Sequence, residues 1–383
     1  MNAPGLPALV PRFAPGDPVP WFVARSPGNP EYHFHTVAGR HVVLLFAGSM
    51  RVPAAAAAWS GLRRRRELFD DERASLFVLS ADRDDELQAR LADELPGIRV
   101  LWDDAARTSM AFGVAAADAT APGSLRFALA AVVLDPTLRV MRWFSAASGG
   151  PEIADAIADF VAALPRPIAG AAQMQAPVLV LPRVFEPEFC RRLIEHYERN
   201  GGQDSGYMRQ RGGRVEGVID HRVKRRSDCL IEDEALKREI GRRFLGRVNP
   251  ELQRVFRFRA TRMERYLVAC YDAQVGGYFR PHRDNEGGGH REFAVTLNLN
   301  AEDYEGGDLC FPEYGRQTYR APTGGACIFS CGLMHEATPV RRGRRYAFLP
   351  FLYDEAAAQR REANSAQYLD PDKHYRYQAP GKG

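Results

Sequence analysis

The sequence predicts an α/β domain followed by a mainly β domain, and three observations support this fold class. Residues from about 10 to 165 alternate continuous apolar runs with helix-friendly segments, as expected when helices pack on a sheet. From Arg262 onward, short strand-like runs are separated by Gly, Asp and Pro turns, a pattern that fits a double-stranded β-helix, or jelly-roll. Between the halves, residues 165–173 lose this periodicity and are rich in proline, glycine and small residues, which indicates a linker.

The length of the chain is consistent with this organisation. Its 383 residues are enough for two or three domains with substantial cores. We therefore expect a first domain, a linker, a second domain and a polar tail on the surface, at residues 1–165, 166–177, 178–355 and 356–383.

Apolar runs bounded by polar residues predict buried strands in the first half. The expected strands cover residues 41–46, 75–80 and 130–134. Helix-friendly segments lie between them at residues 54–69 and 84–93, and helical spacing of apolar residues predicts a closing helix over residues 151–164. This alternation predicts a central, largely parallel sheet.

The second half begins with a predicted strand and a predicted helix. Residues 178–181 form an apolar run, and the helix begins near Pro187, which suits a first turn because its missing N–H has no intrahelical acceptor there. Residues 201–226 are rich in glycine and arginine. Two interpretations of this segment are open: a solvated loop, or a mobile lid that recognises an acidic or carboxylate-bearing substrate.

Two histidines and an aspartate are candidate metal ligands. His282 and Asp284 are two residues apart, and alternate residues of an extended strand point to the same face. His335, further along the chain, can add a second imidazole from a neighbouring strand. Two histidines and one carboxylate are the ligand set of mononuclear non-haem Fe(II) oxygenases, which keep coordination positions open for a co-substrate and oxygen. The sequence therefore predicts an enzyme with iron at these three residues.

A candidate carboxylate-binding arginine follows the second histidine. Arg345, ten residues after His335, can lie deeper in the same barrel and grip a carboxylate in a bidentate fork. A metal combined with a buried carboxylate clamp is what 2-oxoglutarate requires. Arg344 competes for this role, because adjacent residues of a strand face opposite ways and only one of the two can point inward.

Residues from about 178 to 355 resemble the prolyl 4-hydroxylase-type branch of the Fe(II)/2-oxoglutarate dioxygenases. Besides the histidines and the aspartate, the similar motifs are Val268–Tyr271, Gly277–Tyr278, Thr296–Asn300, Glu305–Leu309, Pro322–Gly325 and His335–Tyr346. The resemblance implies Fe(2+) at His282, Asp284 and His335 and the distal carboxylate of 2-oxoglutarate at Arg345. It favours Arg345 over Arg344 because Arg345 directly precedes the aromatic Tyr346.

The resemblance also implies two further co-substrate contacts. Tyr271 matches a tyrosine whose hydroxyl often contacts 2-oxoglutarate. Asn298 stands where relatives place a tyrosine facing the co-substrate, so an amide would take the place of a hydroxyl there.

The implied reaction is hydroxylation of a C–H bond with release of succinate and CO2. The implied substrate is peptidyl, of the prolyl type, or a small molecule, and L-ascorbate is an implied cofactor. The alternative of a different class is a non-catalytic binding or regulatory protein that retains an oxygenase fold. An intact ligand set with its arginine argues against that alternative, because a purely structural role does not require these residue types together.

The first half resembles the thioredoxin-like peroxiredoxins, through the segments Pro15–Phe22, Ala38–Phe46, Leu79–Asp82 and Val133–Pro136. A peroxiredoxin attacks peroxide with a thiolate at the start of the helix after the strand. Here the corresponding residues 47–54 contain no cysteine, so the resemblance implies the fold and not thiol peroxidase activity. Because such folds commonly self-associate, we expect a dimerisation or partner-binding module, with a homodimer formed through residues 1–165.

Composition excludes several other classes. The formal net charge is only +4, so we expect no nucleic-acid partner. No run of about twenty apolar residues predicts a membrane span, and the N-terminus lacks the pattern of a secretory signal, so we expect a cytoplasmic protein. The six cysteines lie between Cys190 and Cys331 without zinc or C-x-x-C spacing, so we expect reduced, structural thiols.

Overall fold

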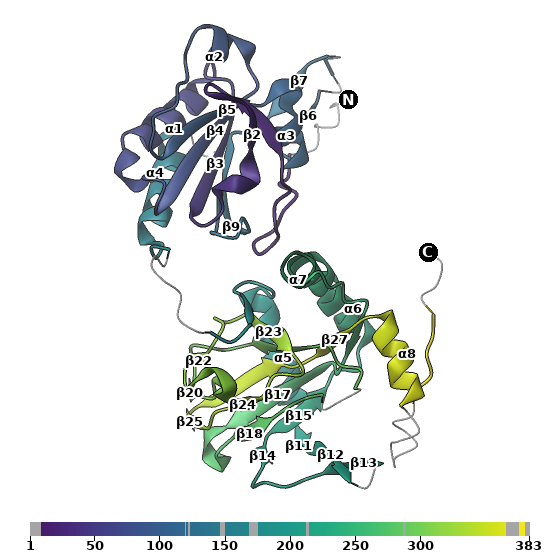
Figure 1. Cartoon of the computed structure of the whole chain (residues 1–383). Helices are drawn as coiled ribbons and strands as arrows, with labels where there is room; N and C mark the ends of the chain where they lie inside the picture. Colours follow the sequence, from purple (N-terminus) through teal and green to yellow (C-terminus); the bar gives the residue numbers. More distant parts are fainter. Residues whose placement is uncertain are drawn as a thin grey trace, which may run out of the picture. The chain divides into compact units, whose positions relative to one another are not determined.

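The computed structural model describes residues 9–118, 120–121, 123–145, 150–167, 175–211, 214–285, 289–364 and 375–379. The chain divides into two compact units, Met1–Gly170 and Ala171–Gly383 (Figure 1). Most of the expected linker at residues 166–177 lies outside the described residues. In the described part of the chain, no helix is both long enough and apolar enough to cross a membrane.

The N-terminal unit is built on a seven-stranded sheet. In spatial order its strands are β2 (Asn29–His33), β1 (Val23–Ser26), β5 (Ile98–Trp102), β4 (Ala74–Ser80), β3 (His41–Gly48), β8 (Ala130–Leu134) and β9 (Val140–Ser145). Strand β4 is parallel to β3 and to β5, but the other neighbours in the sheet are antiparallel. The prediction of a largely parallel sheet is therefore wrong. Strand β9 follows β8 after a short turn, and such a connection permits only an antiparallel pair.

Both faces of this sheet are buried, which explains why β3 is apolar along most of its length. Val43 and Leu45 pack towards α1 (Pro53–Arg63) and α4 (Gly150–Ala163), which lie side by side on one face (Figure 1). Val42 and Leu44 pack on the other face, against Phe112 after α3 (Arg107–Ala111). The predicted helices over 54–69 and 84–93 are shorter in the structure, since α1 ends at Arg63 and α2 covers Arg83–Leu87.

The C-terminal unit contains two principal antiparallel sheets. The larger follows the order β10 (Leu179–Leu181), β23 (Ala326–Ser330), β19 (Phe293–Asn298), β26 (Arg344–Phe348), β17 (Leu267–Asp272), β15 (Ser227–Leu230) and β11 (Gln203–Asp204), with β27 (Phe351–Tyr353) and β16 (Arg262–Glu264) joined through β19. The smaller follows the order β14 (Lys224–Arg225), β18 (Tyr278–His282), β24 (His335–Ala337), β21 (Leu309–Cys310) and β22 (Thr318–Tyr319).

The side chains of β17 point alternately to the two faces of the larger sheet, and they show that helices cover one face and the smaller sheet covers the other. Val268 and Cys270 pack in a core with α5 (Pro187–Asn200), α6 (Glu234–Arg243) and α7 (Asn249–Phe256). Leu267, Ala269 and Tyr271 point to the opposite face, where they pack with residues of the smaller sheet. The space between the two sheets is therefore lined by every second residue of the larger sheet.

Two segments differ from their sequence-based prediction. Residues 201–226 are not a plain loop: they form β11, the hairpin of β12 (Tyr207–Arg211) with β13 (Arg214–Val218), and β14. The side chains of residues 208–216, on which the lid hypothesis partly depends, lie outside the described residues. The expected surface tail begins with helix α8 (Glu355–Ala363), whose Ala357 and Ala358 are fully buried against Tyr353. Residues 365–374 and 380–383 of that tail are not described.

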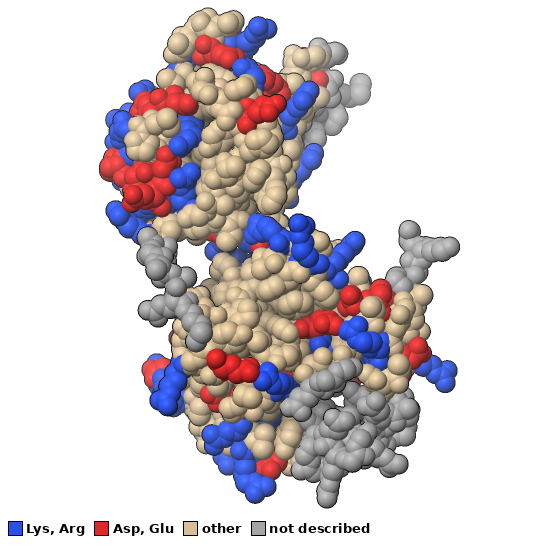
Figure 2. All heavy atoms as spheres, viewed as in Figure 1, with Lys and Arg blue, Asp and Glu red and all other residues tan. Residues whose placement is uncertain are grey.

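The six thiols lie in the interior of the C-terminal unit, and charges of both signs lie on the surface. All six cysteines are free and buried, and burial raises the pKa of Cys190 to about 12 and that of Cys270 to about 11. Figure 2 shows basic and acidic side chains interspersed over this face of each unit. The protonated, buried thiols behave as small apolar groups.

Candidate active site

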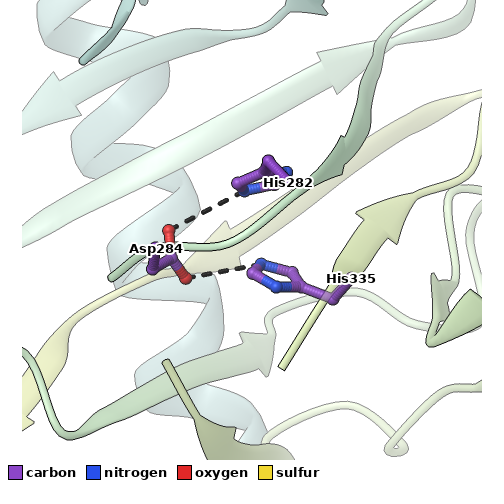
Figure 3. A group of neighbouring side chains, drawn as sticks. All are labelled: His282, Asp284 and His335. Atoms are coloured by element: carbon purple, nitrogen blue, oxygen red, sulfur yellow. Dashed lines mark ion pairs between the residues drawn. The ribbon is translucent and has the colours of Figure 1, made fainter. Parts of the chain in front are cut away.

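The three predicted metal ligands come together between the two sheets. His282 is the last residue of β18, Asp284 follows two residues later, and His335 begins β24 directly opposite His282. The Nε2 atoms of His282 and His335 lie 3.7 and 3.4 Å from the two carboxylate oxygens of Asp284 (Figure 3). One ligand atom from each residue lies within 4.8 Å of the others. Within the described ranges, no other group of three His, Cys, Asp or Glu residues is arranged in this way.

Backbone carbonyls orient both imidazole rings. The Nδ1 atom of His282 is 2.7 Å from the carbonyl oxygen of Arg280, and the Nδ1 atom of His335 is 3.1 Å from that of Leu333. If each Nδ1–H donates to its carbonyl, each Nε2 keeps a free lone pair that points towards Asp284. Metal-bound histidines are commonly held by this kind of hydrogen bond on the second ring nitrogen. The ring of Phe279, stacked 3.5 Å from that of His282, restricts the ring further.

Electrostatics place these residues in the protonation states that bind a metal. Burial, followed by the neighbouring His335, lowers the pKa of His282 to about 4. Burial by itself would raise the pKa of Asp284, but His335, His282, Arg291 and Arg265 together outweigh it and the pKa is lowered. Near neutral pH the site therefore offers a neutral His282 and an ionised carboxylate, as metal binding requires.

Arg345, and not Arg344, points into the same pocket. In β26 the side chains of Tyr346 and Phe348 face the helices, so Arg345, which directly precedes Tyr346, faces the smaller sheet. Its side chain is only 2% exposed and lines the pocket with the three metal-ligand candidates. Arg344 is half exposed and donates a hydrogen bond from Nε to Asp272 at 2.9 Å.

The donor set fits iron and 2-oxoglutarate. Two imidazole nitrogens and one carboxylate are the ligands typical of a mononuclear Fe(II) site. The Nε and Nη1 atoms of Arg345 are buried and have no hydrogen-bond partner in the described part of the chain. Leaving charged donors buried and unpaired is costly, and the carboxylate of a ligand can accept a hydrogen bond from such a guanidinium. The residues present therefore suit a metal with a co-substrate carboxylate beside it.

The two remaining predicted contacts differ in position. Tyr271 lines the pocket directly opposite Arg345 on the neighbouring strand, with its ring centre 4.9 Å from the guanidinium. Asn298 is buried on the same face of the sheet but does not line the pocket. Its Nδ2 donates to the carbonyl oxygen of Ala321 at 2.8 Å, whereas its Oδ1 has no partner among the described residues.

Sequence reasoning missed three polar residues that line the pocket. They are Arg226, Arg265 and Thr296. Thr296 belongs to a motif of the family resemblance, and strand alternation from Asn298 would have placed it on the same face. Arg226 belongs to the arginine-rich segment that was expected to be a solvated loop or a lid over an acidic substrate, and its side chain is only 4% exposed. No sequence signal identifies Arg265, which has a positive φ of 65°.

Comparison with known proteins identifies the family. Residues 266–353 match the family model of the 2OG-Fe(II) oxygenase superfamily. A PKHD-type hydroxylase from Pseudomonas aeruginosa (strain LESB58) is 35% identical over 187 residues, which cover 44% of this chain and 75% of that protein.

Two solved structures are also similar. A prolyl-4-hydroxylase from Pseudomonas putida is 16% identical, with a TM-score of 0.36, over 46% of this chain and 92% of that chain. The peroxidoxin BcpB from Mycobacterium tuberculosis is 19% identical, with a TM-score of 0.34, over 40% of this chain and 99% of that chain. On the sequence matches, this chain belongs through its C-terminal half to the 2OG-Fe(II) oxygenase superfamily and is a homologue of PKHD-type hydroxylases.

Proposed function

We propose that this protein is an Fe(II)- and 2-oxoglutarate-dependent dioxygenase that hydroxylates a C–H bond of a peptidyl, prolyl-type substrate or of a small molecule. Membership of the superfamily supports an oxidoreductase of the dioxygenase type. One observation carries the dependence on both groups: the His282–Asp284–His335 cluster shares a pocket with Arg345, whose buried Nε and Nη1 atoms have no hydrogen-bond partner among the described residues.

Each residue of the site has a distinct task in this proposal. His282, Asp284 and His335 would hold Fe(II), and Arg345 would hold the distal carboxylate of 2-oxoglutarate. When bound, iron and 2-oxoglutarate supply the chemistry that couples release of succinate and CO2 to transfer of one oxygen atom from O2. The chain would orient the co-substrate through Arg345 and Tyr271 and would limit the access of water, since the side chains of Asp284 and His335 are only 14% and 8% exposed.

The apolar part of the pocket suits a C–H donor. Leu309, Phe329 and Phe351 line it together with the metal-ligand candidates. Aliphatic and aromatic side chains give a hydrocarbon group a favourable surface without competing for the metal. This environment is compatible with both proposed substrate classes.

Succinate formation tests the proposal. Metal-free protein is incubated with Fe(II), 2-oxoglutarate, ascorbate and O2, beside His282→Ala and Arg345→Ala. We expect succinate above the level of both variants, because each removes one element of the site. If none forms, anaerobic titration of Fe(II) and 2-oxoglutarate, followed by charge-transfer absorption, distinguishes two cases. Binding without turnover means that the true substrate must trigger oxygen activation, and no binding favours the non-catalytic alternative.

We also propose a role and a fold for each half. The division at residues 1–165, 166–177, 178–355 and 356–383 assigns the chemistry to a double-stranded β-helix. The N-terminal half would be a thioredoxin-like domain without the peroxidatic cysteine, serving dimerisation or partner binding. A monomer in light scattering at high concentration would exclude the homodimer. Cytoplasmic localisation, L-ascorbate as an aid to turnover, and the lack of nucleic-acid or membrane partners stay predictions.

A further inference from the structure

The pocket contains more positive charge than the metal and 2-oxoglutarate require. Besides Arg345, it is lined by Arg226 and Arg265, which the proposed chemistry does not use. Both arginines contact a single carboxylate oxygen: the Nη2 atoms of Arg226 and Arg265 lie 2.6 and 3.3 Å from Oδ2 of Asp228. The two guanidinium groups thus share the one carboxylate that they contact.

The hydrogen bonding of this pair is also incomplete. The Nε atom of Arg226 and the Oδ1 atom of Asp228 are buried without a partner in the part of the chain that the structure describes. Arg226 uses Nη1 to donate to the hydroxyl of Tyr271 at 3.3 Å, which turns the guanidinium towards the pocket. Buried charged donors without acceptors are rare unless a ligand completes them.

The backbone conformation and the surroundings of Arg265 also suit a residue that binds a ligand. Its φ of 65° lies in the left-handed region, which is unfavourable for a side chain of this size. Its guanidinium is 5.4 Å from the ring centre of Phe351, on the apolar wall of the pocket. Burial and the nearby Arg226 and Arg291 lower its pKa to about 10, although Asp228 and Asp284 act in the opposite direction, so like charges are crowded here.

From this cluster we infer a second anion subsite, in which Arg265 and Arg226 bind a carboxylate of the substrate while Arg345 binds that of 2-oxoglutarate. The inference rests on the proposed function and narrows its substrate class to carboxylate-bearing molecules. A carboxylate offers two oxygens, which can accept from both guanidinium groups and neutralise the excess charge. The hydrocarbon part of the substrate would then lie along Phe351 towards the metal-ligand candidates.

Binding of acetate tests the subsite directly. The full chain is loaded with Mn(II) and saturating 2-oxoglutarate, and 13C-labelled acetate is added while its paramagnetic line broadening is followed by NMR. Wild type is compared with Arg265→Gln, which removes the charge, and with Arg265→Lys, which keeps it. Arg342→Gln is the matched control, because Arg342 is 72% exposed, pairs with Glu305 and lies outside the pocket.

We expect saturable broadening in wild type and in Arg342→Gln, at least a tenfold weaker affinity in Arg265→Gln, and a smaller loss in Arg265→Lys. No saturable broadening in wild type would overturn the inference, as would equal affinity in wild type and Arg265→Gln. Unlabelled propionate and the blocked dipeptide N-acetyl-Pro-Glu-amide then compete with acetate. The stronger competitor indicates whether a small acid or an acidic peptide is the better source of the carboxylate.

Failure of the proposed function can be recognised separately. The charge-transfer absorption of Fe(II) with 2-oxoglutarate is recorded anaerobically for the same proteins. Its absence in wild type would contradict the proposed function, whatever acetate does. If Arg265→Gln loses this absorption and acetate binding is unchanged, the arginine serves 2-oxoglutarate and the second subsite is excluded.

Discussion

Two carboxylates of low exposure, Asp85 in the N-terminal unit and Asp284 in the C-terminal unit, have opposite surroundings. Asp85 accepts hydrogen bonds from the backbone N–H of Met50 at 2.8 Å, the hydroxyl of Ser80 at 2.6 Å and Nη1 of Arg90 at 2.9 Å. These partners occupy both carboxylate oxygens. Asp85 therefore ties the turn after β3 to the end of β4, and no oxygen is left for a ligand.

Asp284 has no such partners. The nearest polar atoms of its two histidine neighbours are 3.4 and 3.7 Å from its oxygens, too far for a good hydrogen bond. Among the described residues, no side chain or backbone group donates a hydrogen bond to it. The comparison teaches that a buried carboxylate whose oxygens accept hydrogen bonds from the protein has a structural role. A carboxylate that lacks such donors and lies beside two imidazoles is suited to bind a metal.

The same contrast applies to the turn where a peroxiredoxin would carry its thiolate. Here Ser49 donates from its hydroxyl to Asp82 at 2.5 Å, and Arg51 donates to the same carboxylate oxygen at 2.9 Å. Two polar side chains of this turn are thus paired with one carboxylate at the end of the neighbouring strand, as those around Asp85 are.

Replacing Asp284 is expected to have the largest effect. Asp284→Asn removes a metal ligand and its charge, so we expect succinate formation to fall by at least about 100-fold, since even partners outside the ligand shell cost 10- to 100-fold. The free energy of unfolding of the metal-free protein should change little, because no hydrogen bond of the chain is lost. Both are measured, by succinate assay and urea unfolding. Turnover within threefold of wild type would contradict the assignment.

Replacing Asp85 is expected to give the opposite pattern. Asp85→Asn removes the charge that pairs with Arg90 and places an amide donor among existing donors. We expect the free energy of unfolding of the N-terminal unit to fall by about 2–4 kcal/mol. Succinate formation by the folded protein, assayed well below the unfolding midpoint, should be unchanged. A loss of turnover without a loss of stability would show that the comparison between the two carboxylates is misplaced.

Crowding Arg345 should weaken co-substrate binding. Gly307 has a φ of 67°, and a Cβ added there would lie 3.0 Å from Cδ of Arg345 and 2.8 Å from Val340. We expect Gly307→Ala to raise the KM for 2-oxoglutarate about tenfold, which corresponds to roughly 1.4 kcal/mol. Gly276→Ala is the matched control, since Gly276 has a φ of 64° and its Cβ would meet only Arg225 at 3.9 Å. An equal rise in both variants would attribute the effect to backbone strain.

The smallest predicted effect concerns Lys224, a buried amine near the site. Burial, followed by Arg226, lowers its pKa from 10.5 to about 6. Between these values the unfolded chain binds a proton that the folded chain does not, so stability rises with pH across this window. We expect the free energy of unfolding to rise more steeply with pH in wild type than in Lys224→Met, by at most about 1.4 kcal/mol per pH unit. Parallel slopes between pH 7 and 9 would show that Lys224 stays protonated.

Local sequence patterns predicted the strands and helices that are buried in a regular pattern along their length. Strand β8 has the predicted bounds, and β3 and α4 differ from their predictions by only one or two residues at each end, because apolar runs and helical spacing report burial directly. The short strands β1 and β2 and the helices α6 and α7 were missed. Strand β2 is largely exposed, and α6 and α7 are mostly polar with narrow apolar faces. The predicted direction of β8 relative to β3 was wrong, because the direction of a strand depends on how the chain connects it to its neighbours and not on its own apolar residues.

The residues of the candidate site also fall into those that the sequence predicted and those that only the structure identified. The sequence by itself determined the candidate metal ligands and the family, because the H-x-D spacing, the later histidine and the surrounding motifs are properties of short segments. The resemblance favoured Arg345 over Arg344, but only the tertiary structure gave the physical reason, which is that Tyr346 and Phe348 of β26 face the helices. It alone brought Arg226 and Arg265 to the pocket, because their positions depend on the shared Asp228 and on packing between distant strands. Spacing along one strand is local information, whereas the charge balance of a pocket is a sum over residues that only folding brings together.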